Sequence, residues 1–210
     1  MGTQESSTPV ALPHNAPGSD AGTARLFGGL SPDTFKLAFR QHAAGVAVIT
    51  ADAESGPVGL TATSVFSVSA DPPLLIFSVS DLSSSAATIC RADTLVVHLL
   101  GAAQLHIAKL CATSGVDRFA DRSLWDRLPT GEPYFLDVRA WIRGRVIDRM
   151  TAGSSTIIAV HALEAKVGAG EASEPLVYHN RTWHSLGAHS ALVDAPTVAA
   201  VAPETGSPRP

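Results

Sequence analysis

The feature that most constrains the fold is a series of short, β-branched runs separated by turn residues. Four of these runs follow one another in the first half of the chain, at residues 46–50, 58–61, 65–69 and 74–79. Pro72 and Pro73 stop the third run, because proline donates no hydrogen bond to a neighbouring strand. Short strands joined by turns are typical of antiparallel sheets. The pattern therefore predicts a mainly β fold.

Short helices accompany these strands. Ser31, Pro32 and Asp33 suit the cap, the first position and the positive end of a helix that ends near Gly45. We expect two further short helices at 83–92 and 104–111, and further strands at 95–100, 134–149, 155–166 and 176–183. Many strands with few helices argue against a doubly wound α/β sheet. They favour a closed or nearly closed antiparallel barrel.

The two ends of the chain differ in composition from its middle. Residues 1–29 and 191–210 are rich in Pro, Ser, Thr, Ala and Gly. Such segments are typical of disordered tails, so we expect a single folded domain over residues 30–190. A unit of about 160 residues is large enough to bury its own core.

Composition excludes several classes of protein. The chain has 15 Lys and Arg against 19 Asp and Glu, a net charge of −4 that does not attract a nucleic acid backbone. No apolar run approaches the roughly 20 residues that cross a membrane. Two cysteines, Cys90 and Cys111, are too few for a disulfide framework and indicate a reduced pair. We therefore expect a cytoplasmic protein that binds neither nucleic acid nor a membrane.

Common catalytic and metal-binding patterns are missing from the sequence. His179, His184 and His189 are five residues apart, which fits metal ligands on neither a strand nor a helix. The chain also lacks the Gly-x-Ser-x-Gly, Gly-x-Gly-x-x-Gly and P-loop patterns. We predict no metal site, no hydrolase triad and no Rossmann or Walker nucleotide site.

Two segments place small hydrogen-bonding residues beside strand ends. The first is Ser83, Ser84 and Ser85, and the second is Thr61, Ala62, Thr63 and Ser64. Hydroxyl and backbone N–H groups at the start of a helix can hold a phosphate, although an ordinary helix cap has the same composition. A flat heteroaromatic ring could lie along the second segment, which also suits an ordinary strand and turn.

The order of the segments resembles the short-chain flavin reductase family. The resemblance rests on residues 45–50, 57–64, 67–74, 83–85, 95–100, 117–120, 140–149 and 175–178, and it covers residues 35–186. It implies a six-stranded antiparallel Greek-key split barrel, the FMN-binding split barrel, assembled as a homodimer. It also implies reduction of FMN or FAD by NADH or NADPH, with the reduced flavin supplied to a partner flavin-dependent monooxygenase.

The resemblance also assigns roles to individual residues. It implies that Thr61, Ala62, Thr63 and Ser64 lie along the flavin ring, and that Ser83, Ser84 and Ser85 hold the flavin phosphate. The same comparison places Ser67, Arg118, Phe119 and Tyr178 at the cofactor. The two weak signals above thus become parts of one expected site.

One functional position departs from the family pattern. The family commonly has Gly-Asp-His before the penultimate strand, whereas this chain has Gly153, Ser154 and Ser155. Ser155 therefore stands at the expected catalytic position, where a hydroxyl cannot carry a positive charge. His98 stands where the family usually has Asn. Two alternatives stay open: a flavin-binding protein of this fold without reductase activity, and a heme- or pyridoxal-phosphate-handling relative on the same barrel.

Overall fold

The structure is a computed structural model that describes residues 29–168 and 174–192. Apart from residues 29, 191 and 192, the two predicted tails lie outside the described residues. The first half of the chain forms α1 (Pro32–Arg40), β1 (Ala44–Gly45), β2 (Ala47–Asp52), β3 (Pro57–Ala62), β4 (Phe66–Ala70), β5 (Pro73–Ser80), α2 (Ala86–Ile89) and β6 (Thr94–Leu99). The second half forms η1 (Ala102–Gln104), α3 (Leu105–Ala112), β7 (Trp125–Arg127), β8 (Pro133–Phe135), β9 (Ala140–Ala152), β10 (Ser155–Val167), β11 (Leu176–His179), β12 (Thr182–Ser185) and η2 (Ala188–Ser190). The predicted mainly β fold with short helices is confirmed.

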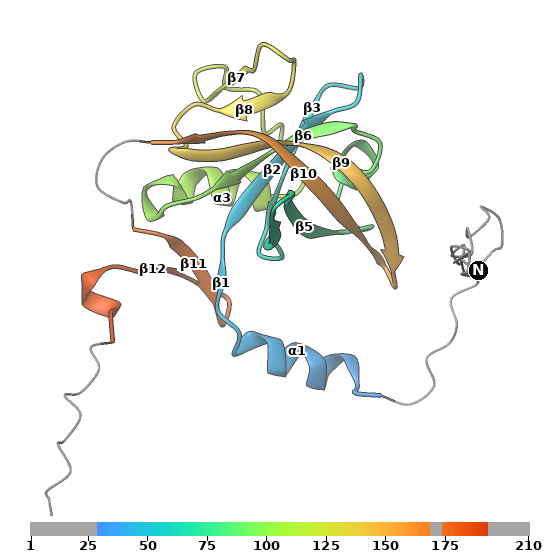
Figure 1. The fold of residues 1–210 in the computed structure, drawn as a ribbon. Helices are drawn as coiled ribbons and strands as arrows, with labels where there is room; N and C mark the ends of the chain where they lie inside the picture. The colour runs from blue at the N-terminus through green and yellow to red at the C-terminus, as the bar shows by residue number, and fades with distance from the viewer. Residues whose placement is uncertain (1–28, 169–173, 193–210) are drawn as a thin grey trace, which may run out of the picture.

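The principal sheet has seven strands in the order β3-β2-β6-β9-β10-β5-β4, and every pairing in it is antiparallel (Figure 1). The six strands implied by the family resemblance are corrected to seven, and the sheet is not closed, because β3 and β4 form its two edges and do not pair with each other. A side chain instead ties the connection that follows β3 to β5, the strand next to the other edge. Ser64, between β3 and β4, accepts a hydrogen bond from the Ser78 amide at 3.0 Å and donates one to the Ser78 carbonyl at 3.2 Å.

Two predicted strands are each interrupted. The predicted strand 134–149 is divided, since β8 ends at Phe135 and β9 begins at Ala140. Between them the Leu136 amide donates to the Leu124 carbonyl, so the chain follows the β7–β8 hairpin and not the main sheet. The predicted strand 176–183 is the hairpin of β11 and β12, with Asn180 and Arg181 at positive φ in its turn.

Strand β2 lies at the centre of the core because both of its faces are buried. Its alternation sends Ile49 into a cluster with Phe77, Leu95 and Ile158 on one side of the sheet. On the other face, Val48 joins a second cluster that includes residues of α3 and of the segment that follows it. The sheet is thus covered by α2 on one side and by α3 with the β7–β8 segment on the other.

Helix α1 begins as predicted, with the Ser31 hydroxyl accepting from the Thr34 amide at 3.1 Å. None of its residues is buried, and it stands apart from the sheet near β1 (Figure 1). Its end is tied to the β11–β12 turn, where the Asn180 amide donates to the Arg40 carbonyl at 3.2 Å. Within the described ranges, no helix is long and apolar enough to span a membrane.

Candidate functional site

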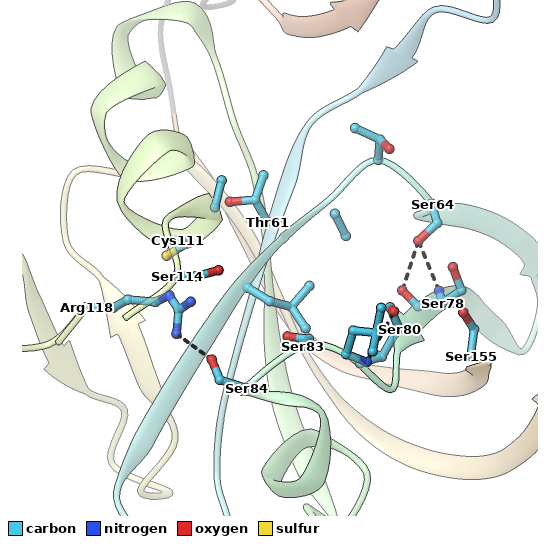
Figure 2. Close-up of a pocket in the computed structure, with 16 residues that line it drawn as sticks. Thr61, Ser64, Ser78, Ser80, Ser83, Ser84, Cys111, Ser114, Arg118 and Ser155 are labelled. Atoms are coloured by element: carbon cyan, nitrogen blue, oxygen red, sulfur yellow. Dashed lines mark hydrogen bonds between the residues drawn. The ribbon is translucent and has the colours of Figure 1, made fainter. Parts of the chain in front are cut away.

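A cavity of about 500 Å³ opens between β3, the end of β5, the start of β10 and the loop that follows α3 (Figure 2). Nine of its sixteen lining residues carry hydroxyl groups: Thr61, Thr63, Ser64, Ser78, Ser80, Ser83, Ser84, Ser114 and Ser155. Arg118 is its one cationic side chain, and neither a carboxylate nor an imidazole is among the described residues that line it. The cavity therefore suits a polar, anionic or uncharged ligand.

The predicted segment 61–64 borders this cavity, with two of its hydroxyls committed to the backbone. The Thr61 hydroxyl donates to the Ala108 carbonyl of α3 at 2.7 Å. Ser64 makes the two bonds to Ser78 described above. Ala62 is largely buried, whereas Thr63 is exposed. The segment thus forms a fixed wall on which Thr63 is the freest side chain.

The three predicted serines separate into two kinds. Helix α2 begins only at Ala86, so Ser83 and Ser84 belong to a turn before it. Both line the cavity, and the Ser83 hydroxyl accepts from the Ser85 amide at 3.3 Å. Ser85 is 1% exposed, donates to the Gly59 carbonyl at 2.9 Å and does not line the cavity.

Arg118 brings a positive charge to the cavity beside these serines. Its guanidinium donates to the Thr113 carbonyl at 2.8 Å and to the Ser84 hydroxyl at 3.4 Å (Figure 2). Its Nε atom is buried and has no hydrogen-bond partner. A buried donor without a partner is costly, and a phosphate oxygen is the acceptor that a guanidinium fork pairs with best. The residues present at this end therefore fit a phosphate group.

Phe119 holds Arg118 in place without reaching the cavity. Its buried ring meets Trp125 edge-on with centroids 4.9 Å apart and stacks on Phe135 at 5.6 Å. The Trp125 indole N–H donates to the Phe119 carbonyl at 2.9 Å. The side chain next to Arg118 is therefore fixed in the core, which limits where the guanidinium can lie.

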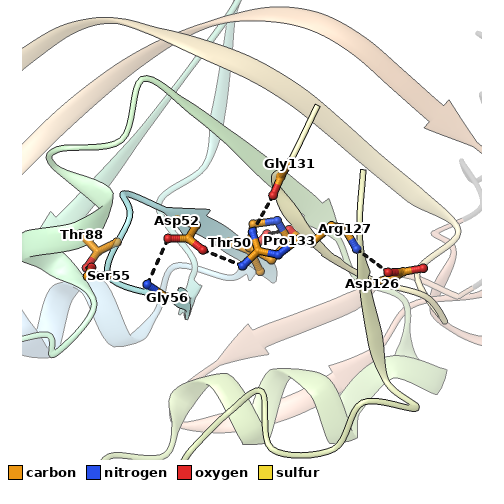
Figure 3. Close-up of polar contacts among 9 residues, drawn as sticks. All are labelled: Thr50, Asp52, Ser55, Gly56, Thr88, Asp126, Arg127, Gly131 and Pro133. Atoms are coloured by element: carbon orange, nitrogen blue, oxygen red, sulfur yellow. Dashed lines mark hydrogen bonds and ion pairs between the residues drawn. The ribbon is translucent and has the colours of Figure 1, made fainter. Parts of the chain in front are cut away.

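The same segment is attached to the sheet at its far end (Figure 3). Arg127 in β7 donates to Asp52 of β2 and to the Gly131 carbonyl, each at 2.6 Å. The second oxygen of Asp52 accepts from the Gly56 amide at 3.1 Å, and the Thr50 hydroxyl donates to the Pro133 carbonyl. These contacts join the β7–β8 hairpin to the β2–β3 hairpin.

Ser155, the expected catalytic residue, lines the cavity at the start of β10. It pairs across the sheet with Ser80, whose neighbour Ser78 on the same face bonds to Ser64. Two other predicted residues lie elsewhere. Ser67 lines an apolar groove of about 400 Å³. Tyr178 lines a second cavity, which meets the first at Thr63 and Ser64.

The sequence analysis did not single out Ser78, Ser80 or Ser114, which also line the cavity. The alternation of β5 contains the missing signal, because Leu75, Phe77 and Val79 are buried in the core. The two serines of β5 must then point to the opposite face. Ser114 follows the end of α3 and carries no comparable pattern.

Two buried side chains stay uncharged at neutral pH: His98 in the core of the sheet and Cys111 in the cavity lining. Burial lowers the pKa of His98 to about 4, against the hydrogen bond to the Val48 carbonyl, which raises it. The Nε2 atom of this ring accepts from the Phe135 amide at 3.1 Å, so Nδ1 carries the proton. Burial raises the pKa of the Cys111 thiol to about 12, so it is not a nucleophile.

The described residues contain no group of three His, Cys, Asp or Glu side chains that could hold a metal ion. The chemistry open to the cavity is therefore that of its hydroxyls and one guanidinium. These groups bind and orient a ligand, and none of them exchanges a proton readily near neutral pH.

Comparisons with known proteins agree on one family. Residues 39–187 match the family model described as "Flavin reductase like domain". The "NADH:FMN oxidoreductase" of Rhodococcus qingshengii is 40% identical over 166 residues, covering 78% of this chain and 86% of that protein. The crystal structure of a flavin reductase domain protein from Arthrobacter sp. FB24 is similar, with a TM-score of 0.71 and 34% identity, covering 78% of this chain and 98% of that one.

A second solved structure is similar in fold and in name. It is the flavin reductase component of a bacterial two-component tryptophan halogenase, with a TM-score of 0.67 and 29% identity. The alignment covers 74% of this chain and 98% of that one.

Proposed function

The chain belongs to the flavin reductase-like family, and from this membership we propose that it is an NAD(P)H-dependent flavin reductase. It reduces FMN or FAD with electrons from NADH or NADPH. The observation that carries this proposal is the match of residues 39–187 to the family together with a hydroxyl-lined cavity that has one guanidinium at its end. A reductase of this kind supplies reduced flavin to a second protein.

The first cavity is the proposed flavin site. The ring lies along the wall of residues 61–64, and the phosphate lies at Ser83, Ser84 and Arg118. The Arg118 guanidinium supports this orientation, because it lines the cavity beside Ser84 and pairs best with an anionic oxygen. The proposal leaves out Ser67, Ser85, Phe119 and Tyr178, none of which lines this cavity.

The protein's part in the reaction is binding and orientation. When bound, the flavin accepts a hydride from a dihydronicotinamide, so the transfer itself needs no acid or base from the protein. The wall of residues 61–64 would hold the flavin ring and orient it for the donor. Ser155 borders the proposed ring position as a neutral hydrogen-bonding group and carries no charge to the donor.

The test is nicotinamide oxidation by the purified protein. Each pair of NADH or NADPH with FMN or FAD is mixed with the protein, and the absorbance of the reduced nicotinamide is followed. Loss of this absorbance at a rate proportional to protein concentration supports the proposal. No turnover with any of these pairs contradicts it.

A second candidate function follows from Ser155. Without a histidine at this position, the protein could hold flavin and not reduce it. A visible spectrum of bound flavin together with no nicotinamide oxidation would support this alternative.

We further propose that the protein is a homodimer and that its partner is a flavin-dependent monooxygenase. The homodimer is supported by apolar side chains that remain exposed on β4 and β6, where Val68 is 57% and Leu99 45% exposed beside the groove that contains Ser67. The monooxygenase is supported by the resemblance and by the halogenase reductase component among the similar structures. Light scattering after size-exclusion chromatography tests the dimer, and a monomer mass contradicts it. The cytoplasmic location stays a prediction.

A further inference from the structure

Two of the three evenly spaced histidines, His179 and His184, lie beside each other on the β11–β12 hairpin. A spacing of five residues would separate them along a single strand, but the turn at residues 180–181 folds β12 back along β11. The register places His184 opposite Val177, which is two residues before His179 in β11, so both histidines are on one face of the hairpin. Their ring centroids are 5.8 Å apart.

The ring nitrogens of both histidines are available to a ligand. Within the described ranges, neither imidazole takes part in a hydrogen bond or an ion pair, whereas His98 and His189 bond to backbone carbonyls. His184 is exposed and His179 is half-buried. A neutral imidazole with an accessible nitrogen is the commonest metal ligand among side chains. The pair therefore has the right chemistry for a transition-metal ion.

The positive charge of the hairpin turn is directed away from this pair. Arg181 lines the second cavity together with Tyr178. Tyr178 directly precedes His179 in β11, so the two side chains point to opposite faces of the hairpin. The Arg181 charge thus lies toward the cavity, and the histidine face is left open to a cation.

The spacing of the two rings is close to that of two imidazoles on one metal ion. With metal–nitrogen distances of about 2.0–2.1 Å and a tetrahedral angle, the centroids of two such rings lie about 5 Å apart. A small rotation of the exposed His184 ring closes the difference from 5.8 Å. In the part of the chain that the structure describes, no third His, Cys, Asp or Glu joins the pair. Water would therefore complete the coordination.

We propose that His179 and His184 form a binding site for a divalent transition-metal ion such as Zn²⁺, Ni²⁺ or Cu²⁺. Two nitrogen ligands suit these ions and not Mg²⁺ or Ca²⁺, which take oxygen ligands. The bound ion joins β11 to β12 beside the turn whose Asn180 amide is bonded to the Arg40 carbonyl of α1. Neither histidine lines the proposed flavin site, and the proposal does not rest on the proposed function.

Calorimetric titration of the untagged full chain with Zn²⁺ alone tests this site. The wild type is expected to bind one ion per chain. His179→Gln and His184→Gln should each bind it at least tenfold more weakly, since loss of an outer-shell partner alone has an effect of this size. His189→Gln is the matched control: it removes an exposed histidine whose ring bonds to the Ser185 carbonyl, and it should bind Zn²⁺ like the wild type.

Copper spectroscopy and thermal unfolding distinguish this site from nonspecific binding. Electron paramagnetic resonance of the Cu²⁺ form counts nitrogen ligands, and we expect two in the wild type and one in His179→Gln and His184→Gln. Zn²⁺ should raise the Tm of the wild type and of His189→Gln more than that of these two variants, because an ion that binds only the folded hairpin stabilises it. Equal Tm values without Zn²⁺ show that all variants fold.

Four results would each overturn the proposal. They are a wild type that binds no Zn²⁺, an affinity in His179→Gln and His184→Gln equal to that of the wild type, an equal loss in His189→Gln, and a single nitrogen ligand in the wild-type Cu²⁺ spectrum.

Discussion

The two adjoining cavities have similar volumes, about 500 and 460 Å³, but different kinds of side chain line them. The first lies against the main sheet, and the hydroxyls of Thr61 and Ser64 in its wall are bonded to backbone groups. The second lies between a helix with no buried residue and the β11–β12 hairpin, and its Arg40 and Arg181 side chains make no ion pair and no side-chain hydrogen bond among the described residues. The first is therefore a preorganised wall with one charge, and the second carries positive charges that the protein itself does not pair.

This difference indicates which side chains serve the fold and which are available to a ligand. A hydroxyl that already satisfies a backbone group contributes to the shape of a site, and its loss costs stability. A polar group that still has a free hydrogen-bond donor or acceptor contributes to the affinity for a ligand. The predictions below separate these two contributions.

The largest effect is expected at Arg118. Arg118→Ala removes the charge at the proposed phosphate end, so FMN binding should weaken by about 2 kcal/mol, roughly thirtyfold in Kd. Fluorescence quenching titrations measure this change. Riboflavin, which has no phosphate, is the internal control, and its affinity should change much less. An equal loss for both ligands would contradict a phosphate role for Arg118.

A change of similar size is expected in the free energy of unfolding when the buried His98 ring is protonated. Its pKa of about 4 in the folded protein lies below the unfolded value near 6.5, so its contribution to stability is present above pH 6.5 and is lost as the pH falls toward 4. The free energy of unfolding should fall by about 2 kcal/mol between pH 7 and pH 5 from this group.

Urea unfolding at the two pH values measures this loss. The variant His98→Asn removes the titrating ring, so its stability should change less between pH 7 and pH 5 than that of the wild type by this amount. Identical pH dependence in the two proteins would show that His98 is not buried in its neutral form.

Ser84 and Ser85 are neighbours with opposite expected roles. Ser84→Ala should weaken FMN binding by about 1 kcal/mol, roughly fivefold, and leave stability unchanged. Ser85→Ala removes the donor to the buried Gly59 carbonyl and should lower the free energy of unfolding by about 1 kcal/mol, with little effect on FMN. Each variant is the control for the other. If both variants lost FMN affinity and kept the stability of the wild type, the assignment of Ser85 to the fold and of Ser84 to the ligand would be wrong.

The smallest effect is expected at the contact shown in Figure 3. Arg127→Ala breaks the pair with Asp52, which is partly exposed, so the free energy of unfolding should fall by about 1 kcal/mol or less. FMN affinity should stay the same, because the Phe119 ring beside Arg118 is fixed in the core by both Trp125 and Phe135, and Arg127 lies over only the Trp125 ring, 5.9 Å from its centroid. Thermal unfolding and FMN titration of the same preparation check both outcomes, and a large loss of FMN affinity would show that the far contact positions Arg118.

Local patterns predicted the sheet well where strands alternate in a single register. The bounds of β2, β3 and β5 lie within one to two residues of the predicted runs, since β-branched residues and proline turns act locally. The break before β9 was not predictable in this way. It depends on a bond between Leu136 and Leu124, two residues whose contact is made only in the folded chain.

The same distinction between local patterns and contacts made only in the folded chain applies to the candidate site. The segments 61–64 and 83–85 were predictable as candidates from residue type and, through the family resemblance, as parts of one site. The sequence could not distinguish Ser84 from Ser85, because the difference depends on the Gly59 carbonyl across the core. The second cavity was also not predictable, since α1 and the β11–β12 turn are about 140 residues apart in the chain and meet only at Arg40 and Asn180.

The central claim is that the first cavity is the flavin site of a reductase, and the KM for FMN in NADH oxidation tests it most directly. The wild type should oxidise NADH in the presence of FMN, and Arg118→Ala should raise the KM for FMN at least tenfold while the KM for NADH changes little. A wild type that oxidises neither NADH nor NADPH with FMN or FAD would contradict the claim. So would an Arg118→Ala variant whose KM for FMN equals that of the wild type.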